Sequence, residues 1–276
     1  MVEPAAKKAA ARFAEEVFQL SERRACRLLK ISRTAKRHPR KRVDDPKLIE
    51  RIKELAATRS RWGYRQLHRS LTREGVKMNQ KKFRRIYREQ KLSLKVRKKS
   101  KLRTQPRVPM PPPTKANERW SMDFMSDQLG PSGRRFRVLT VIDEFTRECV
   151  ALYADFSIPG LLVSRVLSNL GRLPTSIVID NGSEFTGKAM DAWAYENKIK
   201  LDFIRPGKPN ENAFIESFNG KLRNECLSQN WFLGLEDVRR TIEEWRLDYN
   251  ENRPHSSLGG LTPREFAEKT TREDSH

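Results

Sequence analysis

Apolar residues in the first third of the chain recur at the spacing of an α-helix. Between residues 13 and 37 this spacing predicts a short pair of helices, with Ser21 and Ser32 placed to act as N-caps. A second helical unit is predicted to start near Pro46, because proline is well suited to the first helical turn. Its apolar stripe consists of Leu48, Ile52 and Leu55.

The following segment, 61–90, predicts two helices joined by a turn. Gly75 can end the first helix and Asn79 can cap the second, which is the arrangement of a helix-turn-helix. One side of the second helix is apolar, with Phe83, Ile86 and Tyr87. The other side is basic, with Lys81, Lys82, Arg84, Arg85 and Arg88. This helix can pack by its apolar face while the basic face meets DNA; the alternative is a solvent-facing basic helix in a small bundle.

A basic stretch that becomes proline-rich by residue 113 is interpreted as a linker, and after it the pattern changes to strands and helices. Strands are predicted at 120–125, 136–143, 149–153, 177–179 and 200–203. Helices are predicted at 159–169, with Ser157 before it, at 188–197, and from about Asn212. A hairpin followed by β-α-β units indicates an α/β domain with a mixed sheet.

Charge is distributed unevenly along the chain. The formal net charge is +22, but residues 1–113 carry 35 basic and 10 acidic side chains while the rest carries 22 and 25. A basic arm on a nearly neutral domain suggests a polyanionic partner, most commonly nucleic acid.

Other features of the composition exclude several classes of protein. The three cysteines, Cys26, Cys149 and Cys226, are far apart, which argues against a disulfide framework or a zinc cluster and fits a reducing cytoplasm. No apolar run approaches the roughly 20 residues that a bilayer crossing needs. We therefore expect no membrane partner.

Three acids are candidates for chemistry. Asp180 follows the run Ile-Val-Ile and precedes Asn-Gly, so it is expected where a buried strand leaves the sheet. Its alternative role is to accept hydrogen bonds from the next backbone N–H groups. Asp123 lies inside the apolar segment WSMDF, where a charge needs a partner, a cation or a wet edge. Glu216 lies on a polar stripe of the helix that starts near Asn212, beside an apolar stripe that is expected to face the core.

These acids could hold two divalent cations. Oxygen ligands in a chain with few histidines favour Mg²⁺ or Mn²⁺ over zinc. Two such ions can activate an attacking oxygen and stabilise a leaving oxygen on either side of a phosphate. The predicted chemistry is therefore that of phosphodiesters.

The order Asp123, Asp180, Glu216, with 56 and then 35 residues between them, resembles the DDE triad of retroviral-type integrases and transposases. Further motifs resemble the second-frame product of the IS-three family of bacterial insertion-sequence transposases. They are RACRLLKISR, RWGYRQLHRSL with MNQKKFRRIYRE, WSMDF, VIDEFTR, DNGSEF, GKPNENAFIESFNGKLRNECL and YNENRPHSSLGGLTP, and they cover roughly residues 20–265.

The resemblance implies a fold and a division of the chain. The fold is a ribonuclease H-like α/β domain, a mixed sheet with helices on both faces, preceded by small all-α helix-turn-helix units. The expected divisions are a short helical segment at 1–40, a basic helix-turn-helix domain at 41–100, a linker at 101–116, the catalytic core at 117–226 and a C-terminal helical extension at 227–276.

The resemblance also implies roles for single residues. Asp123, Asp180 and Glu216 match the catalytic metal-binding acids, with two Mg²⁺ ions as cofactors and Mn²⁺ as the alternative. Arg223 matches a basic position that touches DNA, with a surface ion pair as its alternative. Asn181, with Gly182, is expected to shape the turn beside Asp180. Asn219 is expected to support the acids, or else to be a polar group on the helix surface.

Several neighbouring residues receive other roles. Asp143 and Glu184 are expected in turns or caps and not in catalysis. His255 lies in a recurring family motif, without an assigned mechanism. His38 and His68 have no partner at zinc spacing, so DNA recognition is assigned to the basic helices, including Lys81, Lys82, Arg85 and Arg88.

The function implied is a DDE transposase that binds double-stranded DNA at the terminal inverted repeats of its element and at the target. It would cleave a strand and transfer the freed 3′-OH, as a homo-oligomer in a synaptic complex in the bacterial cytoplasm, at the nucleoid. An upstream-frame helix-turn-helix and leucine-zipper protein, or a fusion to it, is an expected partner, since no zipper heptads are present here. The alternatives are a catalytically silent DNA-binding regulator and a ribonuclease H-like nuclease that cuts without joining.

Overall fold

The computed structural model describes residues 4–37, 44–94, 111–130, 132–182, 184–205 and 212–273. His38, most of the predicted linker and residues 206–211 lie outside these described residues. The chain consists of two compact units, Met1–Arg51 and Ile52–His276, each held together by its own contacts.

The N-terminal unit contains three helices instead of the predicted pair. They are α1 (Pro4–Phe18), α2 (Glu22–Leu28) and α3 (Arg33–Arg37). The alanine-rich start of the chain extends α1 well before residue 13, as expected for the residue of highest helix propensity. Ser32 accepts a hydrogen bond from the N–H of Ala35 at 3.0 Å, so it does begin a helix, whereas Ser21 precedes α2 without a side-chain cap.

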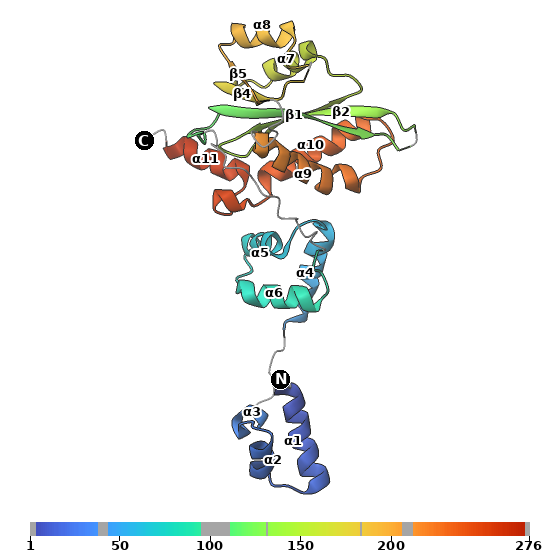
Figure 1. The fold of residues 1–276 in the computed structure, drawn as a ribbon, viewed down its shortest axis with the longest axis vertical. Coiled ribbons are helices and arrows are strands. Elements are labelled where there is room, and N and C mark those ends of the chain that lie inside the picture. Colours follow the sequence, from blue (N-terminus) through green and yellow to red (C-terminus); the bar gives the residue numbers. More distant parts are fainter. Residues whose placement is uncertain are drawn as a thin grey trace. The chain divides into compact units, whose positions relative to one another are not determined.

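The helix predicted from Pro46 is α4 (Pro46–Thr58), and the two helices predicted to form a helix-turn-helix are α5 (Tyr64–Arg73) and α6 (Gln80–Glu89) (Figure 1). Gly75 has a φ of +90°, a conformation that favours glycine after a helix end. Asn79 caps α6 by accepting from the N–H of Lys81 at 2.8 Å. The apolar face of α6 is fully buried, with Phe83, Ile86 and Tyr87.

After these helices the chain forms a five-stranded mixed sheet in the order β3-β2-β1-β4-β5. Its strands are β1 (Arg119–Gln128), β2 (Arg135–Asp143), β3 (Cys149–Asp155), β4 (Ser176–Ile179) and β5 (Lys200–Phe203). The first three pair antiparallel, while β4 and β5 add in parallel to β1. Strand β1 runs three residues beyond its predicted end because the polar pair Asp127 and Gln128 continues the ladder with β2.

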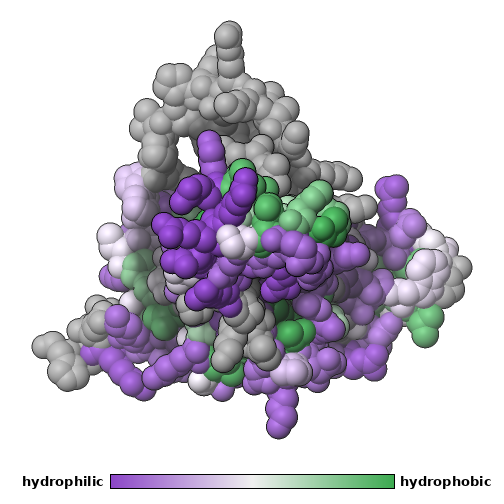
Figure 2. All heavy atoms as spheres, turned by 90° about the horizontal axis from the view of Figure 1, so that it is seen from below, coloured by the Kyte–Doolittle hydropathy of each residue, from purple (hydrophilic) through white to green (hydrophobic). Residues whose placement is uncertain are grey.

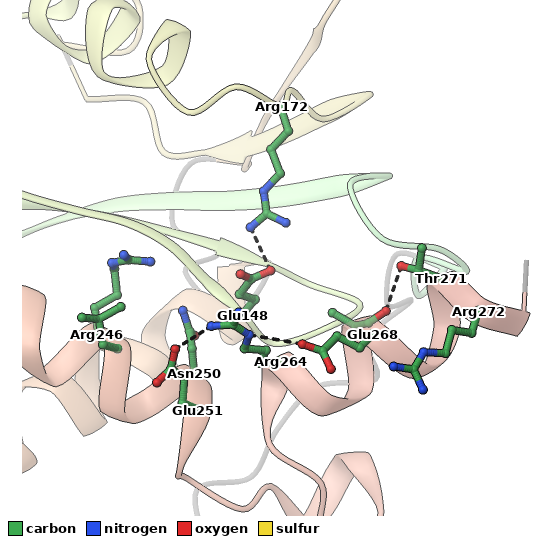
Figure 3. A pocket seen from close by; sticks show the side chains of 11 residues that line it. Glu148, Arg172, Arg246, Asn250, Glu251, Arg264, Glu268, Thr271 and Arg272 are labelled. Atoms are coloured by element: carbon green, nitrogen blue, oxygen red, sulfur yellow. Dashed lines mark hydrogen bonds and ion pairs between the residues drawn. The ribbon is translucent and has the colours of Figure 1, made fainter. Parts of the chain in front are cut away.

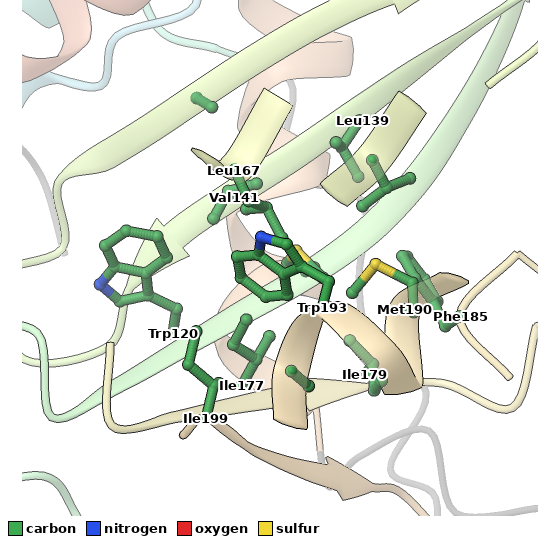
Figure 4. Packing of buried hydrophobic residues seen from close by; sticks show 14 of the residues in the cluster. Trp120, Leu139, Val141, Leu167, Ile177, Ile179, Phe185, Met190, Trp193 and Ile199 are labelled. Carbon is green, nitrogen blue, oxygen red and sulfur yellow. The ribbon is translucent and has the colours of Figure 1, made fainter. Parts of the chain in front are cut away.

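Helices cover both faces of this sheet, as Figure 1 shows. Helices α7 (Gly160–Ser168) and α8 (Lys188–Glu196) contribute to one apolar core, in which Trp120, Leu139 and Ile177 of the sheet pack with Leu167 and Trp193 (Figure 4). Pro159 directly precedes α7, so this helix begins one residue after its predicted start.

The opposite face packs against α9 (Ala213–Glu225) and α10 (Leu235–Glu251), through residues that include Phe136, Phe218 and Tyr249. A short 3-10 turn, η2 (Leu227–Gln229), joins these helices, and η3 (Ser256–Leu258) and α11 (Pro263–Glu273) follow. The fold is therefore the predicted α/β arrangement with helical units before it.

Hydrophilic side chains dominate the coloured surface in Figure 2, with hydrophobic ones in small separate groups. None of the described helices has both the length and the apolar character that a membrane crossing requires.

Candidate active site

Strand alternation places Asp123 and Asp180 on the same face of the sheet. In β1, Trp120 and Met122 belong to the core under α7 and α8, so Asp123 points to the α9 side. Strands β1 and β4 are parallel neighbours with Ser121 opposite Val178. Two further steps along each strand bring Asp123 level with Asp180, which directly follows β4.

Asp123 is half-buried and held by two hydrogen bonds. The N–H of Phe124 donates to Oδ1 at 2.7 Å, and Nδ2 of Asn219 donates to Oδ2 at 2.7 Å. The pKa of Asp123 is raised to about 6, chiefly by burial and also by the charges of Asp180 and Glu216, while the two hydrogen bonds act to lower it. The three acids therefore act electrostatically on one another.

Asp180 is fixed by the turn that follows it. Its Oδ1 accepts from the N–H of Gly182 at 3.0 Å, which is the backbone contact considered as its alternative role. A Cβ at position 182 would lie 2.9 Å from this oxygen, so a larger residue there would displace the Asp180 carboxylate. Asn181 supports the turn from outside, because its Nδ2 donates to the carbonyl of Ile204 at 2.8 Å.

Helix α9 carries Glu216 in its first turn, on the exposed side, while Ile215, Phe218 and Leu222 are buried against the sheet. Asn219 is only 9% exposed, and its bond to Asp123 makes the surface alternative wrong. The start of the helix is tied to β1 by Asn212, whose Nδ2 donates to the carbonyl of Met122 at 3.3 Å.

The donor set fits a hard divalent cation by its chemistry. Oδ1 of Asn219 is buried without a hydrogen-bond partner among the described residues. Carboxylate and amide oxygens are the ligands that Mg²⁺ and Mn²⁺ prefer. Within the described part of the chain, no three Asp, Glu, His or Cys side chains yet stand close enough to share one ion.

Arg223 lies two turns after Glu216 and has a side chain that is 47% exposed. Its Nη2 donates to the carbonyl of Ser126 at 3.1 Å, and its Nη1 is 3.9 Å from Asp127. Both the DNA-contact role and the ion-pair alternative are compatible with this position.

The acids assigned to structural roles do have them. Asp143 is buried and accepts from the N–H groups of Asn117, Phe145 and Thr146, so it organises a turn. Glu184 pairs with Arg137.

Sequence reasoning missed two residues near the site. The guanidinium of Arg137 stacks on the ring of Phe124 at 4.1 Å, next to Asp123 in the chain. Asn212 was expected only to mark a helix start, and its side chain makes no cap bond. Both contacts join segments that are distant in sequence, so no local pattern could indicate them.

The basic face of α6 lines an open groove of about 500 Å³ formed by Lys81, Arg84, Arg85, Arg88 and Glu89. Arg84 lies over the ring of Tyr64 at 5.4 Å, and Arg85 pairs with Glu89 at 2.8 Å. Of the four residues of α6 that were predicted to contact DNA, Lys82 is the one that does not line this groove.

A second, larger groove of about 720 Å³ lies against α10 and α11 (Figure 3). It shares no residue with the three candidate acids. Its charged side chains are largely paired with one another, as in Arg172 with Glu148 at 2.8 Å and Arg264 with Glu251 at 2.6 Å. We assign no chemistry to it.

Comparison with known proteins gives matches along most of the chain. Models of the integrase core domain match residues 113–209 and 197–263, and a model of an HTH-like domain matches residues 43–100. An uncharacterized 31.7 kDa protein of insertion element IS407 from Burkholderia multivorans is 45% identical, over 92% of this chain and 93% of its own. The putative transposase InsK for insertion sequence element IS150 of Escherichia coli is 27% identical, over 84% and 86%.

Among solved structures, the fold matches a chain of the simian T-cell lymphotropic virus intasome, determined with a PP2A regulatory subunit. The TM-score is 0.52 at 16% identity, over 78% of this chain and 74% of that chain.

Proposed function

The chain belongs to the IS-three family of insertion-sequence transposases as a second-frame product, and from this premise we propose that it cuts DNA at the ends of its element and joins the cut strand to a new site. The proposal is supported by the register that brings Asp123 level with Asp180 at one edge of the sheet, and by the effect of the Asp180 and Glu216 charges on the pKa of Asp123.

The proposed reaction has two balanced steps. In the first, the oxygen of water loses a proton and forms a bond to phosphorus at the element's end, the P–O3′ bond breaks, and the leaving 3′-oxygen takes up a proton to become a 3′-OH. In the second, that 3′-OH loses its proton, its oxygen bonds to phosphorus of the target strand, and the displaced target O3′ takes up a proton. No oxidant or covalent protein intermediate is needed.

The side chains divide this work. Asp123, Asp180 and Glu216 would hold two divalent cations, Mg²⁺ or Mn²⁺, which supply neutralisation of phosphate charge and activation of the attacking oxygen. Asn219 orients Asp123 through its Oδ2, and the N–H of Gly182 orients Asp180. Arg223 would contact the DNA backbone beside the reacting end.

The proposed partners follow from the same family. Double-stranded DNA at the terminal inverted repeats would be bound by the basic helices, and target DNA by the core. A homo-oligomer would bring two ends together, with an upstream-frame protein or fusion as a further component. Such a protein would be located on the bacterial nucleoid.

The decisive experiment incubates the purified chain with Mg²⁺ and a DNA fragment that carries an element end. We expect a nicked strand and then a joined product, and neither after chelation of the metal. Binding of end DNA without any cut strand in Mg²⁺ or Mn²⁺ would instead favour the silent regulator, and cutting without joining would favour a nuclease.

The basic groove of α6 gives a prediction about salt. Replacing Lys81 and Arg88 by alanine should weaken binding of end DNA and flatten its dependence on salt. Each lost phosphate contact reduces the slope of log K against log [salt] by about 0.9, so the double variant should lose about 1.8. Lys188→Ala, an exposed lysine of α8, is the matched control and should leave the slope unchanged.

The raised pKa of Asp123 predicts how pH controls metal binding. The pKa is raised from 3.8 to about 6, so without metal the protonated form stabilises the fold. This contribution is fully present below about pH 3.8 and is lost as the pH rises through about 6. Bound Mg²⁺ requires the charged form. The increase in unfolding temperature caused by Mg²⁺ should therefore be large at pH 7.5 and small at pH 5.

Thermal unfolding of Asp123→Asn provides the control for this titration. In that variant Mg²⁺ should give little stabilisation at either pH. A parent protein that Mg²⁺ stabilises equally at both pH values would contradict the titration of Asp123 as the cause.

A further inference from the structure

An exposed tryptophan lies in the segment that joins η2 to α10. Trp231 is 73% exposed and Leu233 is 71% exposed, whereas Phe232 between them is 3% exposed. The alternation is that of an extended segment with one residue directed inward. Large apolar side chains that stay this exposed in a folded chain are candidates for a contact surface.

The indole of Trp231 is held in place by the turn between β1 and β2. The N–H of Gly130 donates to the carbonyl of Phe232 at 3.0 Å, and the Phe232 ring meets Phe136 edge-on at 5.8 Å. A Cβ at position 130 would lie 2.1 Å from Cε2 of Trp231, so the indole rests directly on the glycine backbone. The side chain is therefore an anchored aromatic surface with most of its area uncovered, which reduces the entropy lost when it binds.

The surroundings fit nucleic acid better than a protein. The turn beside the indole continues into two exposed arginines, Arg134 and Arg135. Gly130 lies two residues after the end of β1, the strand that carries Asp123. Gln229, two residues before Trp231, contacts Ser60 after α4 at 3.2 Å. The segment thus lies between the helix-turn-helix and the strand that carries the first acid.

A second copy of this chain is a poorer occupant. Trp231 and Leu233 are the exposed apolar residues of this segment, and its other exposed members, Ser228, Gln229 and Asn230, are polar. Two side chains offer a few hundred Å² at most, below the roughly 800 Å² per partner of a stable protein interface.

We propose that Trp231 is a stacking platform for an unpaired base of the DNA that the transposase holds. The inference rests on the proposed function. An indole binds any base by its face, so the contact adds affinity without reading sequence.

The test measures binding of two probes to the full chain in the Asp123→Asn background, where the DNA remains uncut. One probe is a fully paired element end, and the other carries a single-stranded tail at that end. Trp231→Ala should bind the tailed probe about tenfold more weakly and the paired probe as before, while Trp231→Phe should keep most of the affinity. Leu233→Ala, equally exposed and two residues away, should match the parent on both probes.

Two outcomes would overturn the stacking role. One is an equal loss of affinity in Leu233→Ala and Trp231→Ala. The other is unchanged DNA affinity in Trp231→Ala together with a shift to a smaller oligomer in sedimentation, which would mark a protein interface. Because the readout is binding, failure of strand cleavage in the parent would refute the proposed function without deciding the role of Trp231.

Discussion

Asp123→Asn, Asp180→Asn and Glu216→Gln should each abolish strand cleavage and joining while the protein still binds end DNA. Each substitution keeps the shape of the side chain and removes one negative charge from the place where the three acids interact. Loss of a single preorganised charge-stabilising group costs about 100- to 1,000-fold in rate, so the expected loss is at least that large. The measurement is the rate of strand nicking and joining with saturating Mg²⁺.

Two further variants make this result specific to the site. Asp191→Asn removes an exposed carboxylate from the first turn of α8 and should leave the rate unchanged. Asn219→Ala should have an effect between those of the acid variants and Asp191→Asn. We expect a rate of nicking and joining about 10- to 100-fold below that of the parent, because this substitution removes only the hydrogen bond that orients Asp123. Nicking at the parental rate in all three acid variants would eliminate the proposed site.

Phe218→Ala should destabilise the fold by about 3–5 kcal/mol, the usual cost of deleting a buried phenylalanine. The ring is 1% exposed and makes edge-to-face contacts with Trp245 at 5.6 Å and Tyr249 at 5.1 Å. These contacts fix the face of α9 opposite to the one that carries Glu216, so nicking should also be lost. The free energy of unfolding is measured by urea denaturation at equilibrium.

Tyr195→Ala is the matched control, since this aromatic side chain is 87% exposed on α8. It should change the free energy of unfolding by less than about 0.5 kcal/mol. A small effect of Phe218→Ala would show that α9 is held to the sheet by other contacts.

Helix boundaries were predicted correctly where a single residue is enough to determine them. Gly75 and Asn79 marked the turn before α6 correctly because a positive φ and a side-chain cap are properties of single residues. The N-terminal helix was predicted too short because it begins with alanines, which form helices without an apolar periodicity.

The sequence predicted which acids and which supporting residues, Asn181 and Asn219, form the candidate site, but it did not predict the contacts that these residues make. Asp123 and Asp180 could be placed at strand positions by alternation and run length. The burial of Asn219 could not be predicted from the sequence. Asn219 lies at the edge of the polar stripe of α9, and its exposure depends on how this helix is rotated against the sheet. The pairing of Arg137 with Glu184 depends on the tertiary structure and has no sequence signature.

The order of the parts along the chain has a consequence for damaged copies of the gene. The helices with the basic groove come first, and the third acid comes only with α9. A frameshift or stop before residue 216 would thus yield a polypeptide that still carries the helices proposed to bind DNA and has no third carboxylate. We expect such truncated products to bind the ends of the element and to exclude the full-length protein from them. An element that accumulates mutations would then produce its own competitive inhibitor.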